Sequence, residues 1–527
     1  MPRNLGKAGI FPALAAVGGV VLPLSHACGG SGSSSSGDSA DAGASVLQFH
    51  NHINRDGFFV DPAITKAAAA TFHRDATFDG TLTGHVYASP LFVDAANGPH
   101  GKAAIVVATQ SNDVYALDES TGKPIWQVDS TTLGTPANQA GVGCGDVSPI
   151  GITGTPAIDL GRRLVVLDAI SADANGNIGT QVAYGLSLDD GSKVWSVDLS
   201  TVKDPMGNAF SPKPQNQRGG VLVAGGVAYF VFGGHIGDCG AYHGWVIGVP
   251  LDGNAANVRA WRTQVQGAGI WAPGGASSDG ASVFVSTGNA TAGSATWEES
   301  EGIFRLGTDL SFTKANADFF SPANWANLDQ HDTDISGSGP LVIDAPAMTP
   351  AALLLAQGKD GNLYLLDRGN LGGLASSPLG TLHVLSGEIS QGAAWATLTQ
   401  TGETYVVVRP NKGGTGVGCP TGAGDLVAVK LDPAAPSKMS VAWCADAQGE
   451  GSPIITTSDG SQDAMVWAAG AEGSSRLHAW DLRTGALVFG GGTASDAIPN
   501  VRHFTTVLAA DGRIVVAGDG RAFVFHP

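Results

Sequence analysis

The sequence predicts an all-β fold, an eight-bladed β-propeller, and three observations predict it. The chain of 527 residues contains 76 glycines and only 14% charged residues, a composition that suits turns between strands and disfavours long helices. A short hairpin with fixed Asp, Gly and Trp positions recurs along the chain. Strands rich in small residues recur with it. Together these features indicate one ring of sheets rather than several separate domains.

The recurring hairpin is clearest in "VYALDESTGKPIW" (114–126), an apolar strand, an Asp-to-Gly turn and a strand that ends in Trp126. The same order returns in "AYGLSLDDGSKVWSVD" (183–198) and in "RLHAWDLRTGALVFGG" (476–491), where Phe489 replaces the Trp. Looser copies lie at 361–373 and 425–443. Each copy follows other β-rich segments, so four short strands repeat with a period of about 50–70 residues, which is typical of propeller blades. A β-sandwich with scattered Trp residues does not explain this fixed spacing.

The innermost strand of each blade is expected to be rich in small residues, because these strands crowd around the axis. Eight segments fit this description: 84–94, 151–159, 217–226, 269–280, 337–345, 393–400, 452–460 and 502–512. After the eighth, the chain has room for only two more strands, at 513–518 and 521–527. We therefore expect 69–80 to supply the missing outer strand and to close the ring, which removes the open sheet edge.

Four tryptophans of the repeat are predicted to pack each blade against its neighbour: Trp126, Trp195, Trp261 and Trp443. A four-stranded blade with apolar residues on both faces is not stable alone. The Trp positions therefore predict where the blades meet.

The formal charge of −18 excludes nucleic acid and an anionic membrane surface as expected partners. We expect a small-molecule ligand or a protein of the cell envelope as partner, and a monomeric chain.

The first 27 residues resemble an export signal, with Arg3 and Lys7 before an apolar run from Ala8 to Leu24. Two alternatives follow from the residues after it. Ordinary cleavage would use the small-x-small pattern that ends at Ala27. Lipoprotein processing would instead modify Cys28, and residues 28–46 would form a Gly/Ser-rich tether to a single propeller domain at 47–527. In the usual lipoprotein motif Leu stands three residues before the Cys, whereas here Ser25 stands there and Leu24 lies one position earlier. The Ser/Gly tether favours the lipoprotein, with contact to the membrane only through the lipid, so we expect the protein in the periplasm or at the outer membrane.

The remaining cysteines are even in number, which in an oxidising compartment predicts disulfides. Cys419–Cys444 would join neighbouring strands, and Cys144–Cys239 would join two long loops. Four buried free thiols are the alternative. None of the cysteines has the spacing of a metal knuckle or of a haem attachment site.

The hairpin "VYALDESTGKPIW" resembles the repeat of the pyrroloquinoline-quinone (PQQ) dehydrogenase-like propellers, and the resemblance covers the chain from about residue 47 onward. "GCGDVSPIGITGTPAID", "GIWAPGG", "VSTGNAT" and "LAQGKDGNLYLLDRGNLGG" are similar to an exported bacterial subgroup of that superfamily. This resemblance implies the eight-bladed fold. It leaves function open, because the same propeller serves alcohol dehydrogenases, polyvinyl-alcohol dehydrogenases and a non-catalytic outer-membrane assembly lipoprotein. The adjacent Cys-Cys pair and the haem domain of many such enzymes are absent from this sequence.

Polar residues among the Gly-rich inner strands are predicted to line the mouth of the channel. They are His85, Gln217, Arg218, His243, Trp245, Trp271, Asp332, Thr333, Asp334, Gln391, Glu450, Arg502 and His503. The PQQ resemblance implies a cofactor with three carboxylates, which Arg218 or Arg502 would pair with and on which Trp271 would stack.

The other predicted cofactor contacts are Gln217, His243 and Trp245. The predicted catalytic residues are Asp332, Asp334 and His503. Calcium, a hard cation that prefers oxygen, would be held by Asp332, Asp334 and Glu450.

Each of these residues also has a structural interpretation. Arg218 could pair with a carboxylate inside the channel, and Asp332 and Asp334 could cap a turn. The histidines could be satisfied loop residues, and Trp245 and Trp271 could pack between blades. The joint occurrence of Arg, His, Trp and acids in one region favours a small-molecule site.

The first functional hypothesis is an exported propeller that binds a ligand or acts as an assembly scaffold. The absent Cys-Cys pair and haem motif favour it. The second hypothesis is a quinoprotein dehydrogenase that oxidises an alcohol or a sugar with PQQ and calcium. A third is another propeller enzyme, such as a lyase or a hydrolase.

Overall fold

The computed structural model describes residues 45–138, 142–291, 296–411, 413–422 and 424–527. The chain divides into two units, Met1–Ser39 and Ala40–Pro527, and the second contains all the described residues. The predicted export signal, the lipidation of Cys28 and most of the predicted tether lie outside the described residues. Contacts with the sheets begin already at Ser45 and Val46, before the predicted domain boundary at residue 47.

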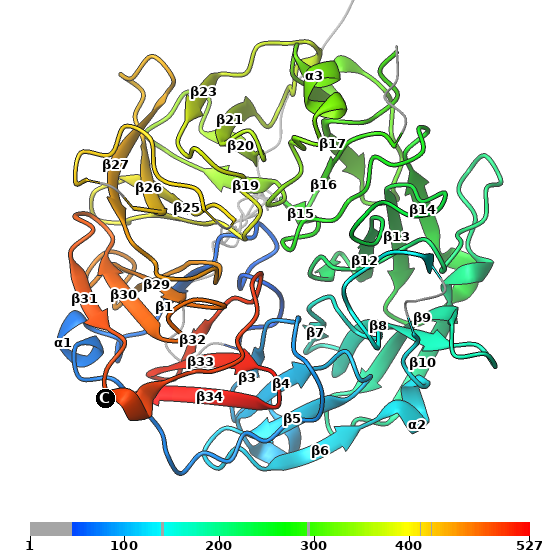
Figure 1. Cartoon of the computed structure of the whole chain (residues 1–527), viewed down its shortest axis with the longest axis horizontal. Helices are drawn as coiled ribbons and strands as arrows, with labels where there is room; N and C mark the ends of the chain where they lie inside the picture. Colours follow the sequence, from blue (N-terminus) through cyan, green and yellow to red (C-terminus); the bar gives the residue numbers. More distant parts are fainter. Residues whose placement is uncertain (1–44, 139–141, 292–295, 412, 423) are drawn as a thin grey trace, which may run out of the picture. The chain divides into compact units, whose positions relative to one another are not determined.

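The second unit is an eight-bladed β-propeller, as the sequence predicts. Figure 1 shows its eight sheets following one another around a central axis in chain order, from blue to red. The strands of the first four sheets, from the axis outward, are as follows. Blade 1 contains β3 (Leu91–Val93), β4 (Ala104–Ala108), β5 (Val114–Asp118) and β6 (Pro124–Val128). Blade 2 contains β7 (Ala157–Asp159), β8 (Leu164–Ala172), β9 (Ile178–Ser187) and β10 (Lys193–Asp198). Blade 3 contains β11 (Leu222–Ala224), β12 (Val227–Phe232), β13 (Trp245–Pro250) and β14 (Arg259–Arg262). Blade 4 contains β15 (Ser277–Ser278), β16 (Ser282–Thr287), β17 (Gly302–Gly307), β18 (Phe319–Ser321) and an added parallel strand, β22 (Gly373–Leu374).

The second four sheets have the same order of strands. Blade 5 contains β19 (Leu341–Asp344), β20 (Ala352–Gln357), β21 (Asn362–Asp367) and β23 (Gly380–His383). Blade 6 contains β24 (Ala394–Thr397), β25 (Thr404–Val408), β26 (Leu426–Leu431) and β27 (Met439–Ala445). Blade 7 contains β28 (Ile454–Thr457), β29 (Met465–Ala469), β30 (Leu477–Asp481) and β31 (Leu487–Gly490), with β1 (Phe58–Val60) parallel to β28 on the axial side. Blade 8 contains β32 (Leu508–Ala510), β33 (Arg513–Gly518), β34 (Arg521–His526) and β2 (His73–Arg74).

Helices are short in the described part of the chain. They are α1 (Lys66–Ala69), α2 (Ser130–Leu133) and α3 (Trp325–Gln330), together with single turns of 3₁₀ helix at Pro99–Gly101, Leu199–Thr201, Ala255–Asn257, Asn316–Asp318 and Ala494–Asp496. No helix among the described residues is long and apolar enough to span a bilayer.

The ring is closed by strands from both ends of the second unit. β2 pairs antiparallel with β34, with His73 opposite His526 and Arg74 opposite Phe525. Thr81 forms a further bridge to Arg521. The prediction that 69–80 supplies the missing outer strand of the eighth blade is confirmed.

The repeated Trp packs against the Asp-to-Gly turn of the next blade, which explains their fixed spacing. The Trp443 indole in blade 6 donates to the Leu482 carbonyl in blade 7 over 2.6 Å. Gly485 of that turn has φ +72°, and a Cβ built on it would lie 2.7 Å from the Trp443 ring. Trp126 makes the equivalent hydrogen bond to the Leu188 carbonyl over 2.8 Å. Trp195 and Trp261 also belong to clusters that join two blades, so the predicted role of all four tryptophans is confirmed.

Residues 45–61, here called the axial belt, run around the axis and hydrogen-bond to each blade in turn. The sequence gives no sign of this arrangement. The contacts from blade 1 to blade 8 are Val46–Phe92, Leu47–Ile158, Gln48–Val223, Ile53–Ser278, Asn54–Val342, Asp56–Trp395, Gly57–Ile455 and Asp61–Gly512. The belt therefore joins all eight blades of the ring.

Arg55 fixes the belt without an acidic partner. Its side chain is fully buried, in a residue that is only 1% exposed, and its guanidinium donates to the backbone carbonyls of Ala276, Phe49, Gly220 and Val221 over 2.9–3.2 Å. Burial lowers the pKa of Arg55 to about 9. The four carbonyls belong to the belt and to blades 3 and 4, so one side chain holds three segments together.

His50 of the belt is held in its neutral form. Its ring stacks on Phe49, with the ring centroids 4.2 Å apart. Nδ1 lies 3.0 Å from the Ala393 carbonyl and Nε2 lies 3.2 Å from Thr506 Oγ1. Burial, and then the positive charge of Arg55, lower the pKa of His50 to about 3.

Both predicted disulfides are present. Cys419–Cys444 links a loop of blade 6 to β27, and Cys144–Cys239 links two loops at the mouth of the channel.

We expect Gly485→Ala to destabilise the protein more than Gly402→Ala. Both glycines lie in turns with nearly equal positive φ, +72° and +69°, but the space around Gly402 is open whereas Gly485 contacts Trp443. The shared backbone penalty is about 1 kcal/mol, and the clash with Trp443 adds about 1–3 kcal/mol. Thermal unfolding of both variants measures the difference. Equal losses would contradict the proposed packing of Trp against the turn.

We expect His50 to make the protein sensitive to acid. The unfolded histidine binds a proton near pH 6.5, whereas the folded one remains neutral down to about pH 3. The contribution of His50 to the free energy of unfolding is therefore fully present above pH 6.5. It falls by up to about 1.4 kcal/mol per pH unit as the pH drops toward 3. Denaturant unfolding at pH 7, 5 and 4 should show a shallower loss for His50→Asn than for the unchanged chain. Exposed His331→Asn is the control and should leave the slope unchanged; identical slopes for all three proteins would refute the assignment.

Candidate ligand-binding site on the propeller axis

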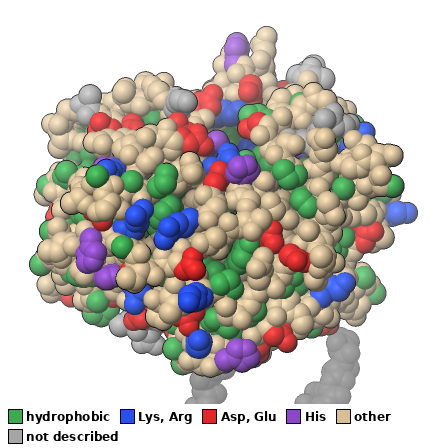
Figure 2. All heavy atoms as spheres, turned by 60° about the horizontal axis from the view of Figure 1, so that its bottom comes forward, with side chains coloured by type: hydrophobic (Ala, Val, Ile, Leu, Met, Phe, Trp, Pro, Cys, Tyr) green, Lys and Arg blue, Asp and Glu red, His purple; other side chains and the backbone are tan. Residues whose placement is uncertain are grey.

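A cavity of about 310 Å³ opens on the axis above the belt. Loops of blades 1 to 6 and blade 8 line it, and Phe49 of the belt contributes to its wall. On the face drawn in Figure 2, acidic and basic side chains are interspersed without a large area of one sign, so the charge pattern of that face marks no extended docking surface.

Two kinds of segment bring functional side chains to this cavity. The first leads into an inner strand and carries Arg218 before β11, Trp271 before β15 and Asp334 before β19. The second follows the next strand and carries Asn289 after β16 and Lys359 after β20. Because the inner strand and the strand after it are antiparallel, the start of the first and the end of the second lie at the same end of the blade.

Arg218 is a half-buried cation without a bonded partner. Its Cζ lies 5.9 Å from the centroids of the Trp271 and Phe504 rings. None of the described residues accepts a hydrogen bond from its guanidinium or forms an ion pair with it. Burial lowers the pKa of Arg218, while the nearby charges of Asp146 and Asp238 oppose the shift.

Lys359 lies near the same indole, with Nζ 5.1 Å from the Trp271 ring centroid. Unlike Arg218 it is neutralised, since Nζ lies 2.7 Å from both Asp332 Oδ1 and Asp334 Oδ2. Burial disfavours the charged form of Lys359, but Asp334 and Asp332 outweigh that effect and raise its pKa.

Asp334 is the buried carboxylate of the cavity. It accepts hydrogen bonds from the Trp271 indole over 3.2 Å and from the Asn289 amide over 2.8 Å. Burial raises the pKa of Asp334, although Lys359 opposes the shift. Behind it lies fully buried Glu301, whose pKa burial and the charge of Asp334 raise well above the usual range. The two acids and Lys359 form one charge network below the indole.

The structure brings five of the predicted site residues to this cavity: Arg218, Trp271, Asp332, Asp334 and His503. The predicted turn-capping role of Asp332 and Asp334 is replaced by their ion pairs with Lys359.

Trp245, Gln217 and His243 do not line the cavity. Trp245 lies in β13 within the core between blades 2 and 3, edge-to-face with Phe210 at 5.5 Å. Gln217 is buried and its amide donates to the Gly219 carbonyl. His243 Nδ1 lies 2.7 Å from the Val265 carbonyl. These three predicted cofactor contacts are structural residues.

Arg502 and His85 are engaged with the same acid. Arg502 Nη2 and His85 Nδ1 each lie 2.7 Å from Asp519 Oδ2. Arg502 also lies 4.8 Å from the Tyr87 ring centroid. Gln391 is buried and accepts from the Phe504 amide over 2.9 Å. These side chains support the walls of the cavity rather than face a ligand.

The predicted calcium ligands Asp332, Asp334 and Glu450 do not come together. Lys359 occupies the position between the two aspartates, whereas Glu450 is grouped with Glu472 and His503. The prediction of this ligand set is wrong, because Lys359, which follows β20, pairs with both aspartates and Glu450 lies in another group.

The Cys144–Cys239 disulfide joins the two loops that carry Asp146 and Asp238 into the cavity wall. Tyr242 of the second loop donates to Asp238 Oδ1 over 2.6 Å. The disulfide therefore fixes the part of the wall that faces Arg218.

Comparison with proteins of known sequence gives no match to any family model and none to any curated protein. Solved structures do match. The quinohemoprotein alcohol dehydrogenase of Comamonas testosteroni superposes with a TM-score of 0.62 at 15% identity, over 93% of this chain and 81% of that one. The quinohemoprotein alcohol dehydrogenase ADHIIG of Pseudomonas putida HK5 gives 0.59 at 13% identity, over 92% and 80%. A europium-containing methanol dehydrogenase gives 0.57 at 13% identity, over 90% of each chain.

The chain is thus an eight-bladed propeller with the fold of the quinoprotein alcohol dehydrogenases. The predicted resemblance to PQQ dehydrogenase-like propellers is confirmed at the level of the fold.

Proposed function

We propose that this chain is an exported propeller that binds a small, planar, anionic molecule in the axial cavity. The observation that carries the proposal is Arg218, a half-buried guanidinium that lines the cavity and has no bonded acceptor among the described residues. A cation removed from water requires an acceptor, and a carboxylate matches its planar fork with two parallel hydrogen bonds.

The surroundings of Arg218 favour a flat ligand. The Trp271 ring and the Phe504 ring lie at equal distance from the guanidinium, and exposed aromatic faces stack on planar rings. A volume of about 310 Å³ suits a small molecule rather than a polymer segment. A purely structural scaffold does not need such a cavity, so ligand binding is favoured over an assembly role.

A quinoprotein dehydrogenase is the second candidate, favoured by Asp334. It is the buried carboxylate of the cavity and its pKa is raised, as suits a group that accepts a proton from an alcohol. The organic part of PQQ fits the residues present: Arg218 would pair with a carboxylate and Trp271 would stack on the ring. When bound, PQQ supplies two-electron oxidation of the alcohol. A calcium ion between Asp332 and Asp334 does not fit, because Lys359 Nζ already lies between them and forms an ion pair with each.

We expect purified protein to bind PQQ and also benzene-1,3,5-tricarboxylate, a planar tricarboxylate without redox chemistry, in calorimetric titrations. Arg218→Ala should weaken both at least ~10-fold, since a charge-assisted hydrogen bond contributes about 1.5–3 kcal/mol. The matched control is Arg259→Ala, which removes an exposed arginine that donates to the backbone carbonyls of Ala256 and Val258, and which should leave binding unchanged.

The same titration separates the two candidates. Binding of both tricarboxylates without dye-linked oxidation of an alcohol panel supports the ligand-binding proposal. Turnover with PQQ that Asp334→Asn abolishes, with PQQ binding retained, would instead establish the dehydrogenase. Failure of the unchanged protein to bind either compound would overturn both.

The proposal of export rests on residues 1–28. Arg3, Lys7 and the apolar run to Leu24 support translocation, and Cys28 before a Gly/Ser tether supports a lipid anchor. An envelope protein partner stays a prediction.

We expect the mature protein to fractionate with membranes in a Gram-negative host and to become soluble in the periplasm on Cys28→Ala. A single acyl chain holds a protein only weakly and a lipoprotein carries more than one, so removal of the anchor should release most of the protein. Soluble protein in both cases would reject the anchor and leave ordinary signal cleavage.

A further inference from the structure

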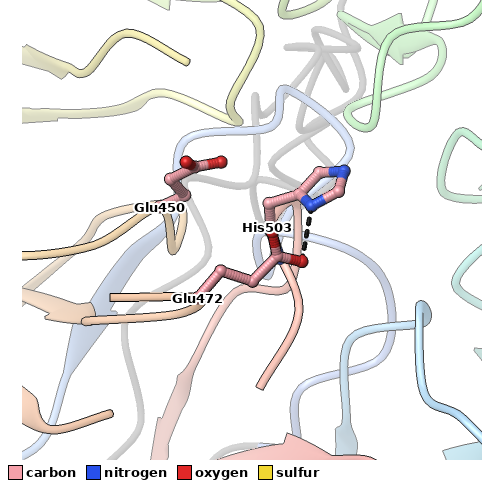
Figure 3. A group of neighbouring side chains, drawn as sticks. All are labelled: Glu450, Glu472 and His503. Atoms are coloured by element: carbon pink, nitrogen blue, oxygen red, sulfur yellow. Dashed lines mark hydrogen bonds and ion pairs between the residues drawn. The ribbon is translucent and has the colours of Figure 1, made fainter. Parts of the chain in front are cut away.

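Three potential metal ligands converge beside the axial cavity, at the junction of blades 7 and 8. Glu450 precedes β28, Glu472 follows β29 and His503 precedes β32. One ligand atom from each lies within 4.8 Å of the other two. Figure 3 shows both carboxylates directed toward the imidazole, with Glu472 and His503 joined by a hydrogen bond.

The backbone holds the two glutamates at this distance. The Glu450 amide donates to the Ala471 carbonyl over 2.8 Å, and the Glu472 amide donates to the Val501 carbonyl over 3.1 Å. A Cβ built on Gly449 would lie 2.3 Å from the backbone of Gly470, so the loops that carry the two carboxylates approach as closely as glycine allows. The position of the carboxylates is therefore set by backbone packing, not by long flexible side chains alone.

Glu450 lacks the partner that a buried carboxylate needs. The residue is 9% exposed, and no residue in the described ranges donates a hydrogen bond to its carboxylate or forms an ion pair with it. Arg409 interacts with Glu450 through space, but its ion pair is with Asp425 over 3.1 Å, and that of Arg502 is with Asp519 over 2.7 Å. A buried charge without a bonded partner is strongly unfavourable, so the Glu450 carboxylate is available to bind a cation.

We propose that Glu450, Glu472 and His503 form a binding site for a divalent transition-metal ion such as Zn²⁺. Two carboxylates balance the charge of the ion, and an imidazole favours a transition metal over calcium or magnesium. The ligand atoms need to close in by rotation of exposed Glu472 and half-buried His503, while Glu450 remains fixed.

Three protein ligands leave coordination positions open, as in catalytic zinc sites. His503 also lines the axial cavity, so the metal site borders the space that the anionic ligand is proposed to occupy. The metal site itself stands independently of that ligand, since Arg218 and Lys359 lie on other blades.

Zinc binding to untagged protein tests the proposal, with Cys28→Ala as the background because Cys28 is the one cysteine outside the two disulfides. Calorimetric titration with Zn²⁺ should show one ion per chain and a rise in the thermal unfolding temperature. Glu450→Gln and His503→Gln should each weaken binding at least ~10-fold, and Ca²⁺ should not compete at equal concentration.

His85→Gln is the matched control. His85 and Asp519 form a carboxylate–imidazole pair of 2.7 Å, but no third metal-binding side chain joins them within the described part of the chain, so the variant should bind Zn²⁺ as the background protein does. Circular dichroism tests whether each variant is folded. If one of the two glutamine variants does not fold, zinc binding by the other tests the site. Absence of Zn²⁺ binding by the background protein, or undiminished binding by a folded Glu450→Gln or His503→Gln variant, would overturn the site.

Discussion

The hydrogen bonds between the axial belt and the eight inner strands are the constraint on which the rest of the structure depends. Each blade edge that faces the axis has backbone groups that need partners, and residues 45–61 provide one partner for each blade in turn. Arg55 strengthens this arrangement by donating to four carbonyls. The belt also contributes Phe49 to the wall of the axial cavity.

The blades could be predicted because their signal is local and repeated. Trp443 and Gly485 contact each other across neighbouring blades, and the same pair of residue types recurs at one spacing, so the pattern shows in the sequence. The belt could not be predicted for the opposite reason. It occurs once, and its contacts reach across as many as 456 residues, as between His50 and Thr506. No periodicity marks it.

The candidate site was predicted in part, for a geometric reason. Arg218, Trp271 and Asp334 precede inner strands, whose positions the small-residue pattern gives. Lys359 follows the next strand, β20. It lies at the same end of the blade as Asp334 because β19 and β20 are antiparallel. The residue that follows the second strand of each predicted blade could have been added to the list of candidates, and Lys359 would then have been included. Trp245 was assigned to the site wrongly. Its side chain packs between blades, and residue type alone does not show whether a strand side chain faces a neighbouring blade or the axis.

The position of the belt near the start of the chain affects when the ring can be completed during synthesis. The belt is synthesised first, yet its last partner is Gly512, and the edge strand β2 waits for β34 near the C-terminus. Neither the centre nor the rim of the ring can be completed until nearly the whole polypeptide has emerged. The early blades must therefore remain with unsatisfied edges during synthesis, a state that favours aggregation. On the proposal of export, that delay favours translocation of the chain before its native ring has closed.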